Sequence, residues 1–404
     1  MRRAKQRILL VHYTAPSVLG GVERIMGVHA RALRAAGHDV AIVAGRGSAQ
    51  PIRMIRIPEL DSRNPAVLRD FAALARGDVT AEHERLVARI EAKLRPHVAR
   101  ADRVVVHNAF TLHKNAALTE ALARLARALP DRIVAWTHDL AWTDAQYAGQ
   151  LHDGRPWSLF RTALPGVRYV AVSDKARDEL VALTGIAPST VRVVPNGVDP
   201  ASLLGLSAAG VALAERLGLF IADPLLVLPV RMTRRKRIDV AIDAVARLRQ
   251  GDLPNTTLVV TGGPGAHNPG NAVYARELVA RAGPGVMLLH DRGVRVSDRV
   301  LGDLYALADA LVLPSANEGF GIPVLEAGWH RLPIVCSDIP ALRAVAGDDA
   351  TYVAPDASGA SVAEAIRTRL ESDPIARLHR RSRAHAWPRV LAEHVLPAIT
   401  GLDP

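Results

Sequence analysis

Short runs of apolar, often β-branched residues alternate with amphipathic stretches along the first half of the chain. Runs that predict buried strands lie at residues 8–12, 39–44, 104–107, 133–136, 169–172 and 191–194, and helical patterns lie at 22–36, 82–100 and 114–129. This alternation is typical of βα units that build a parallel sheet. Gly37 follows the first helical pattern, where a C-terminal glycine commonly ends a helix.

The same alternation restarts after a turn rich in proline and glycine at residues 195–200. Strand patterns follow at 225–230, 258–261, 286–289, 310–313, 334–336 and 352–353, with helical patterns at 238–249, 298–308 and through about the last 40 residues. The restart predicts an α/β protein of two doubly wound, Rossmann-like domains that face a cleft. In such sheets ligands collect outside the carboxyl ends of the strands.

Composition is that of an ordinary globular protein. The 404 residues are 49% hydrophobic and 23% charged, and this length exceeds what one ordinary core accommodates. Cys336 is the single cysteine, so no intrachain disulfide can form, which fits a reducing compartment. The apolar run at 8–11 is too short for a signal-peptide core, and no window reaches the roughly 18 apolar residues of a membrane span. We therefore expect a cytoplasmic location.

The net charge of +11 raises the question of a polyanionic partner. Five of the 51 basic residues are lysine, and the densest basic runs, 231–237 and 377–383, contain few aromatic residues. Because proteins that bind single strands usually stack bases on aromatic side chains, we expect no nucleic-acid partner. Peripheral association with the anionic inner face of a membrane stays open.

Several common sites are excluded by their missing motifs. No Gly-Lys pair, His-Glu-x-x-His or Cys-x-x-Cys occurs, and nowhere are two aspartates separated by one residue. The last absence argues against a metal clamp on a donor phosphate, so we expect no metal. The first loop, residues 13–23, lacks the Gly-x-Gly-x-x-Gly spacing of a dinucleotide site, which argues against hydride transfer.

Two loops in the first half carry candidate chemistry. Gly20, Gly21 and Glu23 lie where the first loop meets its helix, and adjacent glycines at a helix N-terminus let an anion approach the backbone. A plain tight turn is the alternative. His138 comes directly after a strand, with Asp139 available to orient it, so its imidazole could hydrogen-bond a hydroxyl or carry charge. A helix cap in the loop is the alternative there.

Two loops in the second half carry stronger signals. Arg231 and Lys236 bracket the loop after strand 225–230, and two such cations can hold a diphosphate without a metal and stabilise a departing phosphate. A solvated basic loop is the alternative. Glu318 and Glu326 flank a glycine-rich turn at the start of a helix. Because carboxylates accept hydrogen bonds from vicinal hydroxyls, sugar and ribose are natural ligands.

On these motifs the chain resembles the retaining glycosyltransferases of family 4, also called glycosyl transferases group 1, which have the GT-B fold. Matching features in the second half are Arg231 with Lys236, Gly262-Gly263-Pro264, residues 304–310, the turn from Glu318 to Glu326, and residues 332–335. The first half matches more thinly, at residues 20–23, 172–173 and 194–199.

The resemblance implies transfer of a hexose (mannose, glucose or N-acetylglucosamine) from a nucleoside-diphosphate sugar to a hydroxyl acceptor, without a metal. The acceptor could be a glycan, a glycolipid or a small hydroxylated molecule. Residues 1–200 would form the acceptor domain and 201–386 the donor domain. A C-terminal helix at 387–404 would pack back on the first domain.

The resemblance also implies roles for individual residues. Arg231 and Lys236 would bind the donor diphosphate, and Glu326 the ribose. Leu289 and His290 would present backbone to the base, but His290 replaces a glycine common in the family, so UDP, GDP and ADP donors stay open.

Other roles concern the transferred sugar and the acceptor. Glu318 would hold sugar hydroxyls near the reacting carbon, and His138 would contact the donor sugar and stabilise an oxocarbenium-like transition state. The remaining implied contacts are backbone amides of Phe320, Gly321 and Ile322 to the sugar, Gly20 and Gly21 to phosphate and acceptor, and Glu23, Asn108 and Asp139 to the acceptor.

Two other interpretations fit the same residues. One is another GT-B enzyme, either a nucleotide-sugar epimerase or a phosphorylase. The other is a basic, non-catalytic protein that binds anionic surfaces, whose affinity would fall steeply with salt.

Overall fold

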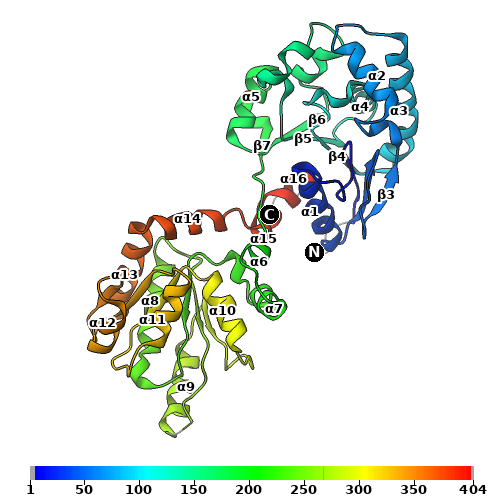
Figure 1. Ribbon diagram of the computed structural model, residues 1–404. Helices are drawn as coiled ribbons and strands as arrows, with labels where there is room; N and C mark the ends of the chain where they lie inside the picture. The colour runs from blue at the N-terminus through cyan, green and yellow to red at the C-terminus, as the bar shows by residue number, and fades with distance from the viewer. Residues whose placement is uncertain (1–4, 267, 402–404) are drawn as a thin grey trace. The chain divides into compact units, whose positions relative to one another are not determined.

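A computed structural model describes residues 5–266 and 268–401, so the outermost ends of the predicted spans, 1–4 and 402–404, lie outside the described residues. The chain divides into two compact units. Unit 1 consists of Met1–Asn196 and Val390–Pro404, and unit 2 of Gly197–Arg389. Each unit contains one parallel sheet with helices against it (Figure 1).

The sheet of unit 1 has seven parallel strands in the order β3-β2-β1-β4-β5-β6-β7. The strands are β1 (Arg7–Val11), β2 (Asp39–Ala44), β3 (Arg53–Arg56), β4 (Arg103–His107), β5 (Ile133–Thr137), β6 (Val167–Ala171) and β7 (Val191–Val193). The helices are α1 (Gly21–Ala35), α2 (Pro65–Leu74), α3 (Ala81–Arg100), α4 (Ala116–Ala128), α5 (Asp174–Thr184) and α16 (Leu396–Thr400). The order reverses direction between β1 and β4, as in a doubly wound fold.

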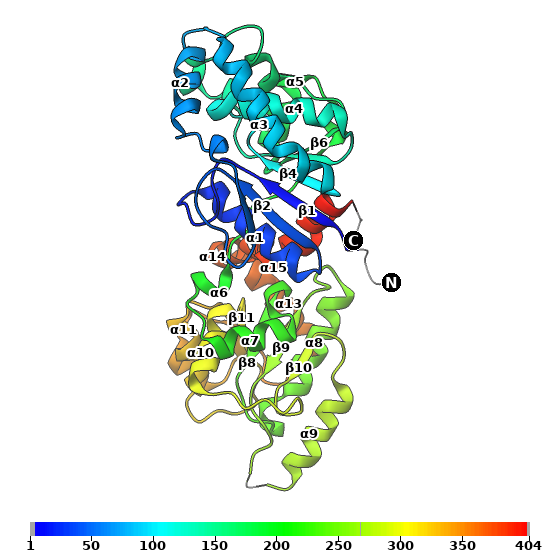
Figure 2. The ribbon, with the colours of Figure 1, turned by 90° about the vertical axis from the view of Figure 1, so that its right-hand side faces the viewer.

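Alternating side chains of the unit 1 strands face two helical layers. Leu9 and Val11 of β1 share one hydrophobic cluster with Ile90 and Leu94 of α3. On the other side, α1 contacts β2 and the C-terminal segment. Both views show the red C-terminal segment beside α1 (Figure 1, Figure 2). Because strand side chains alternate with a period of two, a strand covered on both faces is apolar throughout, which explains why these strands were predictable.

The sheet of unit 2 has six parallel strands in the order β10-β9-β8-β11-β12-β13. The strands are β8 (Leu225–Leu228), β9 (Thr257–Val260), β10 (Val286–Leu288), β11 (Ala310–Leu313), β12 (Ile334–Ser337) and β13 (Thr351–Val353). The helices are α6 (Pro200–Leu203), α7 (Ala208–Leu217), α8 (Ile238–Gln250), α9 (Gly270–Arg281), α10 (Asp298–Leu307), α11 (Ile322–Trp329), α12 (Pro340–Ala346), α13 (Gly359–Ser372), α14 (Pro374–Arg383) and α15 (Trp387–Val390).

Two hydrophobic clusters cover the two faces of the unit 2 sheet. Leu258 and Val260 of β9 pack in the cluster that contains α8. Val259, between them, packs with Leu213 of α7 and Leu304 of α10. The predicted fold class, two doubly wound Rossmann-like units, is therefore confirmed.

Some elements differ from the predicted ones. Strand β3 and helices α2, α5, α6, α7, α9 and α12 were not predicted. Ala36 ends α1 and Gly37 follows with φ +95°, as its sequence position predicts. The predicted C-terminal helix begins at Trp387 but contains a π-helical turn over Leu391–Val395. Pro397 follows this turn and has no amide to donate to the carbonyl four residues before it.

No helix among residues 5–266 and 268–401 combines the length and apolar character that crossing a membrane demands.

Candidate active site

The loops after two neighbouring strands of unit 2 are joined by an ion pair. Lys236 follows β8, Glu318 follows β11, and Lys236 Nζ lies 2.5 Å from Glu318 Oε1. The side chains are only 11% and 7% exposed. The backbone supports this pairing, since the Ala316 amide donates to the Arg235 carbonyl at 2.8 Å. The structure thus brings together two residues that the sequence assigned to the donor site.

Arg235 is a second cation at Glu318 that the sequence analysis did not single out. Its Nη1 donates to the Asn317 carbonyl oxygen at 2.9 Å and lies 3.7 Å from Glu318 Oε2. The neighbouring Arg234 pairs with Glu277 on α9 at 2.8 Å. The basic run at 231–237 signalled a cationic loop, but the run alone could not show which arginine meets the carboxylate.

Arg231 lies at the same strand end and lines a hollow of about 440 Å³ together with Lys236 and Arg235. The described lining residues include Thr233, Asn271 and Pro323, and none of them is an aspartate or glutamate. Three cations around a hollow with no lining carboxylate favour a multiply charged anion such as a diphosphate.

The glycine pair at 262–263 lets the loop after β9 approach the loop after β8. A Cβ on Gly262 would overlap the Val230 carbonyl oxygen, which is backbone and cannot move aside. The approach is fixed by a 2.9 Å hydrogen bond from the Met232 amide to the Gly263 carbonyl. This pair therefore shapes one border of the hollow.

Leu289 and His290, the expected base contacts, are differently placed. Leu289 is buried, its amide donates to Val260 and its carbonyl accepts from Val294. His290 is exposed, and its ring lies so close to Gly263 that a Cβ there would come within 2.6 Å of Nδ1. A base contact at this position would therefore depend mainly on His290.

Glu326 is oriented by a buried tyrosine. The Tyr305 hydroxyl donates to Glu326 Oε2 at 2.7 Å, and the Tyr305 ring stacks on His330 at 5.5 Å between centroids. Glu326 itself is half-buried, one turn into α11. The tyrosine bonds Oε2 and not the second oxygen, Oε1. The carboxylate is therefore held in place while Oε1 can still accept a hydrogen bond from a ligand.

The turn before α11 has the backbone that its glycines suggest. Gly321 precedes the helix with φ +102°, a conformation that favours glycine, and a Cβ there would press on Leu342. Phe320 and Ile322 on either side are exposed. Gly321 itself is buried, so only the two flanking residues of this predicted sugar-binding turn lie on the surface of unit 2.

In unit 1, the carboxyl ends of β1, β4 and β5 bring three histidines together. His107 Nδ1 lies 3.1 Å from His138 Nε2, and His12 Nδ1 lies 3.0 Å from the His107 carbonyl oxygen. Because a carbonyl only accepts, His12 Nδ1 carries a proton. His12 Nε2 lies 3.6 Å from Glu23 Oε1 on α1. Sequence analysis found His138 and Glu23 but missed His12 and His107. Each of these two ends an apolar run that predicts a buried strand, so the pattern indicates core residues.

The expectation that Asp139 orients His138 is wrong. Asp139 Oδ2 instead accepts from Asn108 Nδ2 at 2.8 Å. Asn108 Oδ1 accepts from the His138 and Asp139 amides at 2.8 and 3.1 Å. Asn108 therefore clamps the loop after β5 through one side chain, and the His138 ring takes its direction from His107.

Burial sets the charge of this cluster. Burial, assisted by His12, lowers the pKa of His138 to about 3, so the imidazole is neutral near pH 7. Burial by itself would raise the pKa of Glu23, but hydrogen bonds from His12 and Thr14 outweigh it and lower that pKa to about 2. Thr14 Oγ1 donates to Glu23 Oε1 at 2.5 Å. The cluster thus presents the Glu23 carboxylate and the neutral imidazole of His138 at the strand ends.

The two predicted glycines differ in what they do. Gly20 is the N-cap of α1, and a Cβ on it would overlap the Glu23 carboxylate, so its small size leaves room for Glu23. Gly21 has nothing within 4 Å of the place a Cβ would take. Across the part of the chain that the structure describes, no group of three or more histidine, cysteine, aspartate or glutamate side chains is arranged to hold a metal ion.

Comparison with known families agrees with this architecture. The family model "Glycosyltransferase Family 4" matches residues 19–202, and the model "Glycosyl transferases group 1" matches residues 223–372. Two doubly wound, Rossmann-like units define the GT-B fold class. The chain belongs to glycosyltransferase family 4.

Curated relatives match over part of their length. A D-inositol 3-phosphate glycosyltransferase of Jonesia denitrificans is 35% identical over 193 residues, which cover 46% of this chain and 45% of that protein. A protein of the same name from Kineococcus radiotolerans is 32% identical over 246 residues, 54% of each. The chain thus spans about half the length of the curated relatives it matches. A solved glycosyltransferase structure from Rickettsia africae ESF-5 is 18% identical with a TM-score of 0.37, covering 98% of both chains.

Proposed function

We propose that the protein is a retaining glycosyltransferase that moves a hexose from a nucleoside-diphosphate sugar to a hydroxyl acceptor without a metal. The observation that carries the proposal is the Lys236–Glu318 pair at 2.5 Å, beside a hollow that Arg231 and Arg235 also line. It joins a cation for phosphate to a carboxylate for sugar hydroxyls at the carboxyl ends of β8 and β11, where doubly wound folds bind ligands.

The donor diphosphate would bind in the 440 Å³ hollow. Arg231 and Lys236 donate charge-assisted hydrogen bonds to phosphate oxygens, and Arg235 adds a third positive charge. Glu326, held by the Tyr305 hydroxyl through Oε2, has Oε1 left to accept from a ribose hydroxyl. UDP, GDP and ADP donors all satisfy this arrangement.

The sugar would lie against the turn before α11. Glu318 Oε1 accepts from Lys236, while Oε2, which lies 3.7 Å from Arg235, can accept from a sugar hydroxyl. The amides of residues 320–322 add donors to the same sugar. His138 would contact the donor sugar as a neutral imidazole, which places no positive charge beside an oxocarbenium-like carbon.

The reaction needs no protein nucleophile. The bond from the anomeric carbon to the diphosphate oxygen breaks as the acceptor oxygen attacks on the same face, which retains the configuration. The acceptor proton passes to an oxygen of the departing diphosphate, whose added negative charge Arg231 and Lys236 stabilise. The remaining contribution of the protein is orientation.

The acceptor is the least constrained part of the proposal. Relatives named D-inositol 3-phosphate glycosyltransferases make a phosphorylated polyol the first acceptor to test. A glycan or glycolipid is the next, and a glycolipid would place this basic protein peripherally at the inner membrane face. Glu23, ionised and held by Thr14, would accept from an acceptor hydroxyl in unit 1.

The experiment is a transfer assay with UDP-, GDP- and ADP-hexoses in the presence of EDTA, with the product anomer read by NMR. We expect one base to support transfer with retention, and Lys236→Met to lower turnover on the order of 10²–10³-fold. Lys175→Met is the matched control, because Lys175 also lies 2.5 Å from a glutamate, Glu179, but on the surface.

Other outcomes identify the other functions. Conversion of donor without acceptor would indicate an epimerase, and a requirement for free phosphate would indicate a phosphorylase. Absence of turnover with every donor, combined with salt-sensitive binding to anionic vesicles that survives Glu318→Ala, would replace the proposal with a non-catalytic binder.

A further inference from the structure

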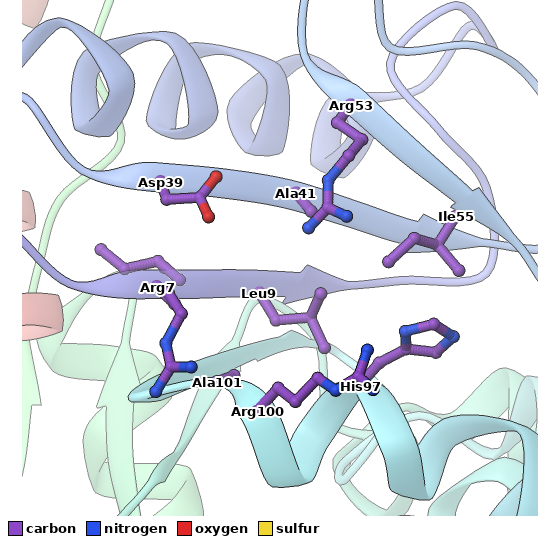
Figure 3. A pocket seen from close by; sticks show the side chains of 10 residues that line it. Arg7, Leu9, Asp39, Ala41, Arg53, Ile55, His97, Arg100 and Ala101 are labelled. Carbon is purple, nitrogen blue, oxygen red and sulfur yellow. The ribbon is translucent and has the colours of Figure 1, made fainter.

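A second hollow, of about 230 Å³, lies in unit 1 at the amino ends of its first strands. Its floor is apolar, formed by Leu9 of β1, Ala41 of β2 and Ile55 of β3. Since a water molecule takes up about 30 Å³ in the liquid, the hollow has room for a group of several heavy atoms. The polar side chains around it are Arg7, Asp39, Arg53, His97 and Arg100 (Figure 3).

The rim of this hollow carries more positive than negative charge. Arg53 extends from β3 and Arg100 from the end of α3, on opposite sides of the hollow (Figure 3). Within residues 5–266 and 268–401, neither guanidinium has an ion-pair or hydrogen-bond partner. Arg7 is the third arginine, and it pairs with Asp102 at 3.0 Å. Asp39 is the one carboxylate among the lining residues.

The pKa of His97 is affected by the same positive charges. Burial is the main reason why its pKa lies below the usual value, and the charges of Arg100 and Arg53 lower it further. Two uncompensated guanidiniums thus act on one half-buried imidazole. The dipole at the end of α3 accounts for a cation at Arg100, but it does not account for Arg53, which starts a strand on the far side of the hollow.

The hollow is separate from the candidate active site. Glu23 and His138 lie beyond the carboxyl ends of the strands, whereas Arg7 and Arg53 begin their strands. Strand β1 is five residues long, so at about 3.3 Å per residue roughly 16 Å separates the two ends. A ligand in this hollow is therefore a second ligand, not the donor or the group that accepts the sugar.

We propose that this hollow binds a phosphate group, gripped by Arg53 and Arg100, with the carbon part of the ligand on the floor of Leu9, Ala41 and Ile55. Guanidinium groups suit phosphate because their donors match its oxygens two at a time. A small phosphate ester and the phosphate of a lipid headgroup share this chemistry. The site lies on unit 1 alone and does not depend on the proposed sugar transfer.

The test uses His97 as a local reporter, because phosphate would also enter the unit 2 hollow. The protein carries ¹³C-labelled histidine, His97→Gln assigns the signal, and the pKa of His97 is followed by NMR with and without inorganic phosphate or glycerol phosphate. We expect phosphate to raise this pKa, since a bound anion favours the imidazolium. In Arg53→Ala/Arg100→Ala the phosphate-induced change disappears, and in Arg69→Ala, an exposed arginine on α2, it persists.

Vesicles distinguish the two sources of phosphate. If lipid is the source, the protein sediments with vesicles containing phosphatidylglycerol but not with phosphatidylcholine alone, and Arg53→Ala/Arg100→Ala loses at least tenfold in binding. If a free ester is the source, phosphate shifts His97 and the double variant sediments like the wild type. A His97 pKa indifferent to phosphate, together with vesicle binding unchanged in the double variant, overturns the proposal.

Discussion

Lys236 Nζ lies 2.5 Å from Glu318 Oε1, with both side chains almost wholly buried, although the two residues are 82 positions apart in the chain. The pair therefore does two things. It holds the loops after β8 and β11 together, and it presents a cation and a carboxylate to whatever enters the adjacent hollow. Because the charges compensate each other only as a pair, the removal of one leaves the other nearly buried and unpaired.

This coupling predicts that Glu318→Ala destabilises unit 2 by about 3 kcal/mol, since the Lys236 ammonium would be left beside Arg235. The double variant Lys236→Met/Glu318→Gln should lose less than Glu318→Ala alone. The measurement is hydrogen exchange of peptides from β8 and β11 in urea, which reports unit 2 separately. Lys175→Met, at an exposed pair of equal distance on α5 of unit 1, should cost less than about 1 kcal/mol, which hydrogen exchange of β6 peptides would report. A double variant as unstable as Glu318→Ala, or more so, would contradict the coupling.

The hydrogen bond from Tyr305 to Glu326 predicts a substitution that weakens donor binding but leaves turnover nearly unchanged. Tyr305→Phe removes the hydroxyl that orients Glu326 but keeps the ring on His330, so stability should fall by only about 1 kcal/mol. If Glu326 holds the ribose, the donor KM rises several-fold while kcat stays nearly constant. Tyr352→Phe is the control, because that hydroxyl bonds the Gly347 carbonyl at the surface. An unchanged KM in Tyr305→Phe would remove Glu326 from the donor site.

Two glycine-to-alanine substitutions should act in opposite directions. Gly262→Ala places a methyl group on the Val230 carbonyl and should destabilise unit 2 by about 1–3 kcal/mol. Gly302 lies inside α10, and a Cβ on it would have no atom of another residue within 4 Å. Gly302→Ala should therefore stabilise unit 2 by roughly 0.5–1 kcal/mol. The measurement is the urea midpoint of hydrogen exchange in unit 2 peptides. If Gly262→Ala left this midpoint unchanged, stability would not require the close approach of the two loops.

The fold was predictable where strands are buried on both faces. Residues 310–313, for example, are buried throughout and read as a continuous apolar run. Strand β3 escaped prediction because it is an edge strand that begins and ends with arginine. Helix α9 escaped because it buries only Tyr274 and Leu278, which gives a weak helical pattern.

The candidate site was predictable in its residue types but not in its pairings. The positions of Lys236 and Glu318 follow from motifs, yet their contact depends on β8 and β11 being neighbours in the sheet. His12 and His107 end apolar runs, and a pattern cannot show that their rings meet Glu23 and His138. Asp139 was assigned to His138 because the two are adjacent in sequence. In the structure its carboxylate instead accepts a hydrogen bond from Asn108.

Thr14 predicts how the charge of Glu23 is held. Thr14→Val removes one of the hydrogen bonds that keep the pKa of Glu23 near 2, so this pKa should rise. The measurement is ¹³C NMR of the Glu23 carboxyl across pH 2–6. Ser17→Ala is the control, because Ser17 accepts from the Ser48 amide and does not contact Glu23. An unchanged pKa in Thr14→Val would assign the depression to His12 and the backbone amide of Glu23.

Three histidines whose pKa is strongly lowered predict that unit 1 is sensitive to acid. Burial lowers the pKa of His29 and His138 to about 3, and that of His107 well below its usual value. An unfolded histidine takes up a proton near pH 6.5, whereas these stay neutral in the folded unit. Their stabilising contribution is therefore complete above pH 6.5 and is lost as pH falls from about 6.5 toward 3, by at most about 1.4 kcal/mol per pH unit for each histidine.

Glu23 affects stability at a lower pH than the histidines do. Because its pKa is lowered to about 2, its contribution to stability is lost only as pH falls toward 2. Between pH 7 and 5.5 the histidines should thus dominate, and peptides from β1 and β4 should lose protection in urea sooner than peptides from β8 and β11. His29→Phe fills a similar volume against Trp136 without titrating, so it should make the loss shallower. Equal pH slopes in the wild type and His29→Phe would mean that His29 is protonated in the folded unit, contrary to its burial.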